Sequence, residues 1–377
     1  MSDDAHRGAN GFFADVTTMR AQFDGRVPSY AAVLGHVETM LEEPSSALGQ
    51  ALDRVWGQRT FHVVYDRPLL LLAALRAEAV VEGPSHPLYG AIGTEEPRAE
   101  EVSLEKVRRA LSPDRARLFA TLAERWVQTN DTLRSVVWRW PAYLAGCEGG
   151  AVPVALVDLG ASAGLNLAAE RLPAVWTDST GAAIPVASKV KAVARIGLDA
   201  RPVDLTVPEN VTWMRACIWP GDRGRGDRLE AGLRAFWDAR RDGAGPVLEA
   251  MDVSGFAARL ADVSMEHEGA LVLAYQSYMR DYLAPDTREA HRAALHEWLG
   301  TVSSGRAMWA ELEASPVAER RSHPATIIVH VRAEGGDVRE LEIGRTSHHP
   351  FEVQTIAEAV RELEGALLCW KRRAEEC

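Results

Sequence analysis

The chain has 377 residues, of which 47% are hydrophobic and 25% are charged. This is the composition of an ordinary globular protein. The length exceeds the size at which single cores usually stop growing, so we expect one large α/β domain and a second folded element. The formal net charge of −11 excludes the broad basic surface that binds phosphate backbones, so we expect no nucleic-acid partner.

Nothing in the sequence indicates export or insertion into a membrane. The four cysteines show no metal-ligand spacing, which is typical of a reduced protein. The segment Met1–Phe13 carries no basic and apolar signal, and the longest apolar run, Leu69–Leu75, is much shorter than a bilayer span. We therefore expect a cytoplasmic protein without a membrane partner.

Residues 1–150 are expected to form an N-terminal helical domain. Between Phe12 and about Gly146 the apolar residues recur at helical spacing, and almost none alternate with the period of a strand. Tyr30, Val33 and Leu34, for example, fall on one helix face. The pattern predicts a bundle of about six or seven helices and no strand.

Residues 151–377 are expected to form an α/β domain with a sheet of seven strands. After Gly150 the pattern changes to short β-rich runs separated by helices, which predicts a mostly parallel sheet. A short connection makes the last two strands a hairpin, so the final strand should run antiparallel to the other six. A small β-hairpin insertion is expected near 176–191. The expected strands are Val154–Asp158, Ala192–Leu198, Val247–Met251, Ala270–Tyr275, Ala307–Leu312, Thr326–Val331 and Arg339–Ile343.

The most informative segment is Val154–Leu167, where an apolar strand runs through Asp158 into a turn of small residues and then an expected helix. Small residues let backbone amides approach a ligand, and the helix start adds a positive dipole end. Two chemistries fit this turn, Gly160-Ala161-Ser162-Ala163-Gly164. One is a loop that binds an adenosyl group; the other is the G-x-S-x-G elbow of a serine hydrolase, with Ser162 as nucleophile.

The position of the turn favours the adenosyl-binding loop. A hydrolase elbow follows several strands, whereas everything before Val154 is expected to be helical, and no Asp is obviously placed to orient His330 or His348. The expected sheet, with this turn after its first strand, resembles the Rossmann-like S-adenosylmethionine-dependent methyltransferases. A nicotinamide or flavin cofactor is less expected, because G-x-G-x-x-G is absent.

The methyltransferase resemblance implies a set of residues that hold S-adenosylmethionine. Asp199, after the second strand, would bind the ribose hydroxyls, since a carboxylate accepts two hydrogen bonds in one plane. Asp252, after the third strand, would accept from the adenine amino group, although it equally suits a helix N-cap. The full cofactor set is Asp158, Gly160, Ser162, Gly164, Asn166, Asp199 and Asp252.

A second set of residues is expected to face a small-molecule acceptor, in a cleft between the helical region and the sheet. Gln276 and Ser277 leave the fourth strand at its carboxyl end, and Gln128 and Asn130 end an amphipathic helix, where they equally suit a helix cap. At other strand ends, Tyr278 and His348 are the candidate catalytic residues. No metal site is expected, because His291 and His296 do not share one helix face.

Several motifs together resemble a bacterial family of unknown function. They are R-W-V-Q-T-N-D at Arg125–Asp131, D-L-G-A-S-A-G-L-N at Asp158–Asn166, R-I-G-L-D at Arg195–Asp199 and A-C-I-W-P at Ala216–Pro220. The resemblance covers nearly the whole chain and implies the domain layout, but no established activity. The sequence therefore predicts methyl transfer to a small molecule. A serine hydrolase and a non-catalytic nucleoside-binding or scaffolding protein stay open as alternatives.

Overall fold

The computed structural model describes residues 11–61, 63, 65–303, 305–315, 323–333 and 336–375. The chain divides into two compact units, and each is described by itself. The first unit comprises Met1–Thr129 with Leu205–Asp227, and the second comprises Asn130–Asp204 with Arg228–Cys377. The boundary expected near residue 150 is therefore too late, and the second unit is interrupted by a segment that belongs to the first.

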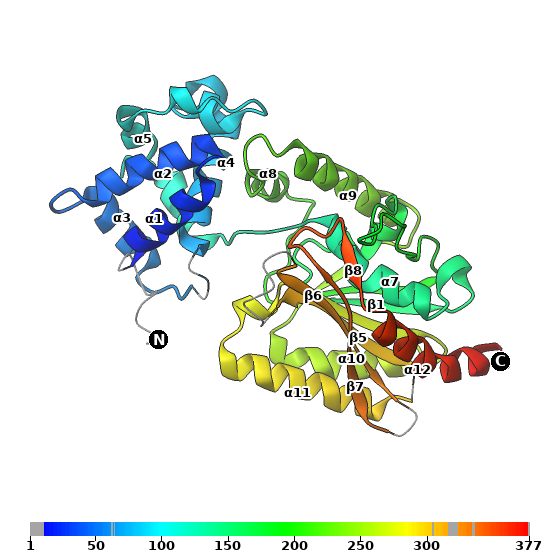
Figure 1. Cartoon of the computed structure of the whole chain (residues 1–377). Helices are drawn as coiled ribbons and strands as arrows, with labels where there is room; N and C mark the ends of the chain where they lie inside the picture. Colours follow the sequence, from blue (N-terminus) through cyan, green and yellow to red (C-terminus); the bar gives the residue numbers. More distant parts are fainter. Residues whose placement is uncertain are drawn as a thin grey trace. The chain divides into compact units, whose positions relative to one another are not determined.

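The first unit is built from helices around one apolar core (Figure 1). Aromatic side chains from separate helices meet in this core, as where Phe12 packs edge-on against Trp56. Every element before Val154 in the described part of the chain is helical. The principal helices of this unit are α1 (Phe12–Phe23), α2 (Pro28–Leu41), α3 (Ala47–Trp56), α4 (Asp66–Glu82), α5 (Leu104–Ala110), α6 (Ala116–Glu124) and α8 (Pro208–Ala216).

The second unit is organised around an eight-stranded sheet with the order β3-β2-β1-β4-β5-β6-β7-β8. The first five strands are parallel, and β6, β7 and β8 continue the sheet as an antiparallel meander. The strands are β1 (Val154–Leu159), β2 (Ala192–Asp199), β3 (Val247–Ala250), β4 (Leu271–Ser277), β5 (Ala307–Ala314), β6 (Ala325–Arg332), β7 (Val338–Thr346) and β8 (Val353–Thr355).

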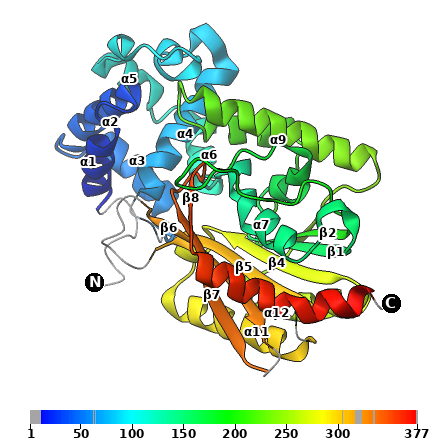
Figure 2. The same cartoon turned by 45° about the vertical axis from the view of Figure 1, so that its right-hand side comes forward.

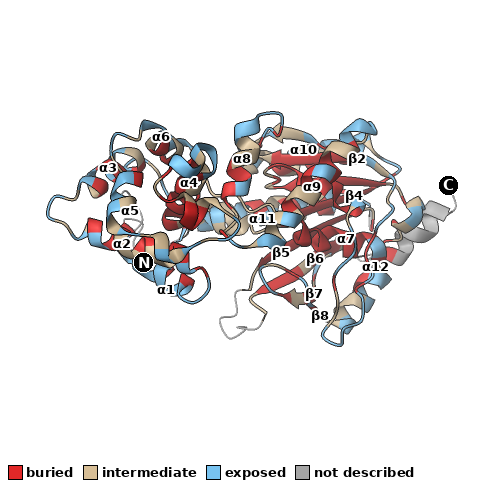
Figure 3. Ribbon diagram, turned by 90° about the horizontal axis from the view of Figure 1, so that it is seen from above, coloured by how far each residue is buried: buried red, intermediate tan, exposed pale blue. Residues whose placement is uncertain are grey.

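Helices cover both faces of this sheet, which explains the continuous apolar runs of its central strands (Figures 2 and 3). Every residue of β1 is buried. One face packs against α7 (Val136–Leu144) and α12 (Ala357–Glu375). The other face packs against α10 (Phe256–Glu266) and α11 (Pro285–Thr301). The long helix α9 (Arg223–Arg241) begins in the first unit and continues into the second.

The direction of the last strands differs from the expected arrangement of six parallel strands and a final antiparallel one. β6 is the strand that reverses, because it pairs antiparallel with both β5 and β7. The physical reason lies in the connection between Ala314 and Ala325, which is too short for the crossover of about a dozen residues that parallel neighbours need. The hairpin between β6 and β7 is confirmed, and β8 is an additional short strand.

The insertion expected near 176–191 contains a turn and a single antiparallel bridge in place of two paired strands. Its turn is present, with the Asp178 side chain accepting from the Thr180 amide at 2.8 Å. Only one antiparallel bridge, Thr177 to Ala183, follows from it. No helix in the described part of the chain is both long and apolar enough to cross a bilayer.

Candidate functional site

The strand order of the second unit reverses between β1 and β4. From β1 the chain proceeds to β2 and β3 on one side, and from β4 it proceeds to β5 on the other. In open α/β sheets, ligands bind at the carboxyl ends of the strands at such a switch point. Two turns meet here, since a Cβ atom added to Gly160 would lie 2.9 Å from Cγ of Met279. The carboxyl ends of β1 and β4 therefore define the candidate site.

The turn after β1 has a backbone that small residues make possible. Gly160, Ser162 and Gly164 all have positive φ, at 79°, 53° and 70°, and this region is costly for the serine. Asp199, at the end of β2, stabilises the turn, because its Oδ2 accepts from the Ser162 amide at 2.8 Å. Its Oδ1 accepts from the amide of Arg201 at 2.7 Å. The carboxylate of Asp199 is thus fixed beside the turn.

The element that follows the turn is a short 3₁₀ helix, Leu165–Arg171, rather than the expected α-helix. Its dipole adds little to any ligand site, because seven residues align few peptide groups. Buried Arg195 of β2 fixes this segment by donating to the Leu167 carbonyl at 2.6 Å and to Glu170 at 2.7 Å. The backbone carbonyl of Asn166 accepts from Trp138 Nε1 at 2.9 Å. Packing and side-chain hydrogen bonds therefore hold the turn in place.

Asp158, the last residue but one of β1, lies inside the protein and not at the ligand edge. It is 4% exposed and faces the same side of the sheet as its register partner, Tyr275. Burial raises the pKa of Asp158 to about 8, and the nearby charge of Asp199 acts in the same direction. The Asp158 carboxyl is consequently protonated at neutral pH, and its buried position argues against direct cofactor binding.

The two candidate catalytic residues come together beyond the end of β4. Nδ1 of His348 lies 2.9 Å from the hydroxyl of Tyr278, and Tyr278 has a positive φ of 53°. The guanidinium of Arg134 lies 4.2 Å from the centre of the Tyr278 ring. Partial desolvation lowers the pKa of His348, and the positive charges of Arg134 and His349 lower it further. His348 is therefore neutral at pH 7 and able to accept a proton.

Arg134 is a functional candidate that the sequence analysis missed. Its side chain is 8% exposed, and within the described ranges it forms neither a hydrogen bond nor an ion pair. Burial lowers its pKa, but arginine stays charged in proteins. A buried charge is usually paired, so this guanidinium suits the anionic group of a ligand. In the sequence, the position of Arg134 just after the Q-T-N-D motif is the feature that could have indicated this role.

Asp131 connects several groups near Arg134 through hydrogen bonds and ion pairs. Its carboxylate is 3% exposed, and it pairs with Arg228 at 3.0 and 3.1 Å and with His349 Nδ1 at 2.7 Å. It also accepts from the Leu133 amide at the start of the 3₁₀ helix Thr132–Ser135. Burial alone would raise the pKa of Asp131, but the bonds from His349 and Arg228 hold it well below its usual range. Asp131 is thus a permanent anion that orients this cluster.

Gln276 does not join the site. Its side chain is 1% exposed and lies on the opposite side of the sheet from Tyr275. Its Nε2 donates to Glu313 at 2.9 Å, and its Oε1 lies 3.1 Å from Nε2 of His291. Both polar ends of the amide are used inside the core, so Gln276 is not available to a substrate. Ser277, the last residue of β4, is half-buried.

The other predicted residues are engaged at a helix start or fall in different units. The Asp252 carboxylate accepts from Ser254 N at 3.0 Å and caps the short helix after β3, so the N-cap interpretation holds there. Gln128 belongs to the first unit and Asn130 to the second. The Gln128 amide donates to the Cys217 sulfur at 3.5 Å.

Comparison with known proteins gives a family but no activity. No curated protein matches the chain, and no solved structure matches it. A family model described as an uncharacterized protein conserved in bacteria, DUF2332, matches residues 18–354. That span includes the turn after β1, the Asp131 cluster, Tyr278 and His348. The chain therefore belongs to the DUF2332 family of bacterial proteins.

Proposed function

We propose that this protein transfers a methyl group from S-adenosylmethionine to a small-molecule acceptor at the carboxyl ends of β1 and β4. The observation that carries the proposal is the position of Asp199, whose carboxylate is fixed by the amides of Ser162 and Arg201. A carboxylate offers about four lone-pair directions. Two remain after these bonds, which suits the two neighbouring hydroxyls of a ribose.

Fewer residues are available to hold this cofactor than the sequence implied. Asp199 would hold the ribose, and the positive-φ turn from Gly160 to Gly164 would approach the nucleoside. Asp158 and Asp252 are engaged elsewhere, in the core and in a helix cap. When bound, S-adenosylmethionine supplies an electrophilic methyl group on its sulfonium.

The Tyr278 and His348 pair would serve the acceptor. Neutral His348 would accept the proton that the acceptor loses, and its bond to the Tyr278 hydroxyl orients the ring. Arg134, buried beside Tyr278, would bind a carboxylate of the cofactor or of the acceptor. The chain's main contribution is to align the two reactants and exclude water. The buried free thiol of Cys217 supports a reducing, cytoplasmic location as part of this proposal.

The serine-hydrolase alternative has one observation in its favour, the positive φ of Ser162, which a nucleophile elbow also shows. The histidines considered for it are bonded elsewhere: His348 to Tyr278, and His330 to His296 and Glu311. Ser162→Ala separates the two functions. The hydrolase would lose all activity, whereas the methyltransferase would only bind its cofactor more weakly.

Calorimetry with S-adenosylmethionine and S-adenosylhomocysteine tests the proposal. Asp199→Asn should weaken the binding of both ligands at least about tenfold, since the second carboxylate oxygen is lost. Asp252→Asn is the matched control, because this aspartate also ends a neighbouring strand but bonds only its own helix start. Absence of binding to the wild-type chain at millimolar concentration contradicts the proposal. Binding without turnover on any acceptor favours a non-catalytic nucleoside-binding protein.

A further inference from the structure

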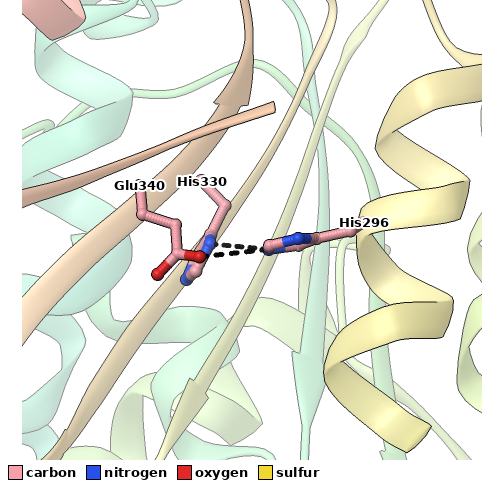
Figure 4. Close-up of side chains that lie close together, drawn as sticks. All are labelled: His296, His330 and Glu340. Atoms are coloured by element: carbon pink, nitrogen blue, oxygen red, sulfur yellow. Dashed lines mark hydrogen bonds and ion pairs between the residues drawn. The ribbon is translucent and has the colours of Figure 1, made fainter. Parts of the chain in front are cut away.

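A second cluster of polar side chains lies on the α11 face of the sheet, away from the turn after β1. Figure 4 shows His296 of α11, His330 of β6 and Glu340 of β7 pointing toward one another. Nε2 of His296 lies 3.0 Å from Nδ1 of His330 and 4.0 Å from Oε1 of Glu340. One ligand atom from each residue lies within 4.8 Å of the others.

We propose that His296, His330 and Glu340 bind a zinc ion. Zinc takes imidazole nitrogen at about 2.0–2.1 Å and carboxylate oxygen at similar distances. Around a tetrahedral ion such atoms are about 3.3 Å apart, and the separations of 3.0 and 4.0 Å lie on either side of that value. Two imidazoles and one carboxylate also match the protein ligands of many zinc sites that keep one open position.

Glu311 prepares His330 for this role. It lies behind the ring, with its Oε1 3.3 Å from Nε2 of His330, and both side chains are buried. A proton on Nε2, shared with this carboxylate, would leave the lone pair of His330 on Nδ1, the atom that faces His296. Carboxylates that orient a ligating histidine in this way are typical of metal sites. Trp309 fixes the ring plane by stacking on His330 at 4.1 Å.

The charge and exposure of the cluster suit an ion that enters from solvent. The side chains of His296 and Glu340 are 27% and 38% exposed, so water can complete the coordination. Oε1 of Glu340, the oxygen that faces His296, also accepts from Arg292, so a bound ion would share Oε1 with this guanidinium or take Oε2 after a rotation of the carboxylate.

The site was not visible in the sequence because its ligands come from three elements. The two histidines of α11 contact different partners: His291 bonds Gln276, and His296 bonds His330. Bound zinc would tie α11 to the β6–β7 hairpin. This gives a measurable consequence for stability, because a ligand that binds only the folded state raises the unfolding temperature.

Zinc binding to the metal-stripped full-length chain tests the inference, with competition against a chromogenic chelator and thermal unfolding as readouts. We expect one ion per chain with micromolar or tighter affinity, and a higher unfolding temperature with zinc. His296→Gln and Glu340→Gln, both at partly exposed positions, should weaken binding at least about tenfold. They should also abolish the thermal shift.

The matched control is His267→Gln, which removes an imidazole at the end of α10 and should leave zinc affinity unchanged. Glu311→Gln should weaken binding about tenfold while its amide still fills the space. If the wild-type chain does not bind zinc, the two histidines form an ordinary hydrogen-bonded pair and the proposal is wrong. Equal effects of His296→Gln and His267→Gln would overturn it as well.

Discussion

Arg134 is buried and has no counter-ion in contact among the described residues, so its contributions to stability and to function should oppose each other. Arg134→Met removes a desolvated charge and keeps most of the side-chain volume. We expect the free energy of unfolding to rise by about 1 kcal/mol or more, reduced by the lost contact with the Tyr278 ring. Denaturant unfolding measures this change, and calorimetry with S-adenosylhomocysteine shows whether the same variant also loses affinity for the cofactor.

Arg139→Met is the control for this prediction. Arg139 is also buried, at 0% exposure, but its Nε and Nη1 donate to the carbonyls of Ala187 and Ala169 at 2.9 and 3.0 Å. Its loss should destabilise the fold by about 3 kcal/mol.

Binding of 5′-methylthioadenosine, which lacks a carboxylate, identifies the partner of Arg134. If Arg134→Met weakens the binding of S-adenosylhomocysteine but not of 5′-methylthioadenosine, Arg134 binds the carboxylate of the cofactor. If the binding of neither compound weakens, Arg134 binds the acceptor. A destabilised Arg134→Met variant would contradict the assignment of Arg134 as a ligand-binding residue.

Asp158 predicts how stability depends on pH. Its pKa is about 8 in the folded chain because of burial, against about 3.9 when unfolded. The folded state therefore holds an extra proton between these values, and stability should fall as pH rises from about 4 to 8. Asp158→Asn keeps a neutral side chain and should flatten the decline in unfolding temperature. Burial raises the pKa of Glu313 to about 7, so a weaker decline should remain. An unchanged pH profile in Asp158→Asn would show that Asp158 is ionised in the fold.

At the scale of elements, the sequence predicted seven strands close to their observed positions because a buried strand is a local apolar run. The expected Ala192–Leu198, for example, differs from β2 by one end residue. Strand direction depends on the length of the connection between two strands. The apolar pattern within a strand carries no information about that length. Tyr278 and His348 were placed at strand ends one by one, and their 2.9 Å contact is tertiary. Arg134 and the zinc ligands were missed for the same reason, since each becomes distinctive only through its neighbours in space.

One buried ion pair contributes to the stability of the short helix after the β1 turn. Arg195 and Glu170 are each 7% exposed at their side chains and lie 2.7 Å apart. Glu170→Leu should cost about 3–5 kcal/mol of unfolding free energy, because it leaves Arg195 buried and unpaired. The double variant with Arg195→Met should recover much of this loss, as measured by denaturant unfolding. A double variant that loses as much as Glu170→Leu alone would mean that the pair itself carries the energy, and additive losses would mean that the two side chains do not interact.

At the scale of the whole molecule, the chain passes from the first unit to the second, returns for Leu205–Asp227 and passes back again. The returning segment contributes Trp213 and Cys217 to the apolar core of the first unit. Neither unit is therefore one continuous stretch of sequence. A cut at residue 130 separates this segment from the core in which its apolar side chains are buried.

This connectivity predicts which fragment of the chain folds. Residues 130–377 alone should aggregate or unfold at a lower temperature, since Trp213 and its neighbours lose the core that covers them. Replacing residues 205–227 by a flexible linker of about ten glycines and serines should restore a soluble, cooperatively unfolding sheet unit, because both of its segments remain. Near-ultraviolet circular dichroism and thermal unfolding compare the two fragments. Equal behaviour would mean that the returning segment does not need the first unit. If the linked fragment also binds S-adenosylhomocysteine, the second unit is sufficient for cofactor binding, as the role proposed for Asp199 predicts.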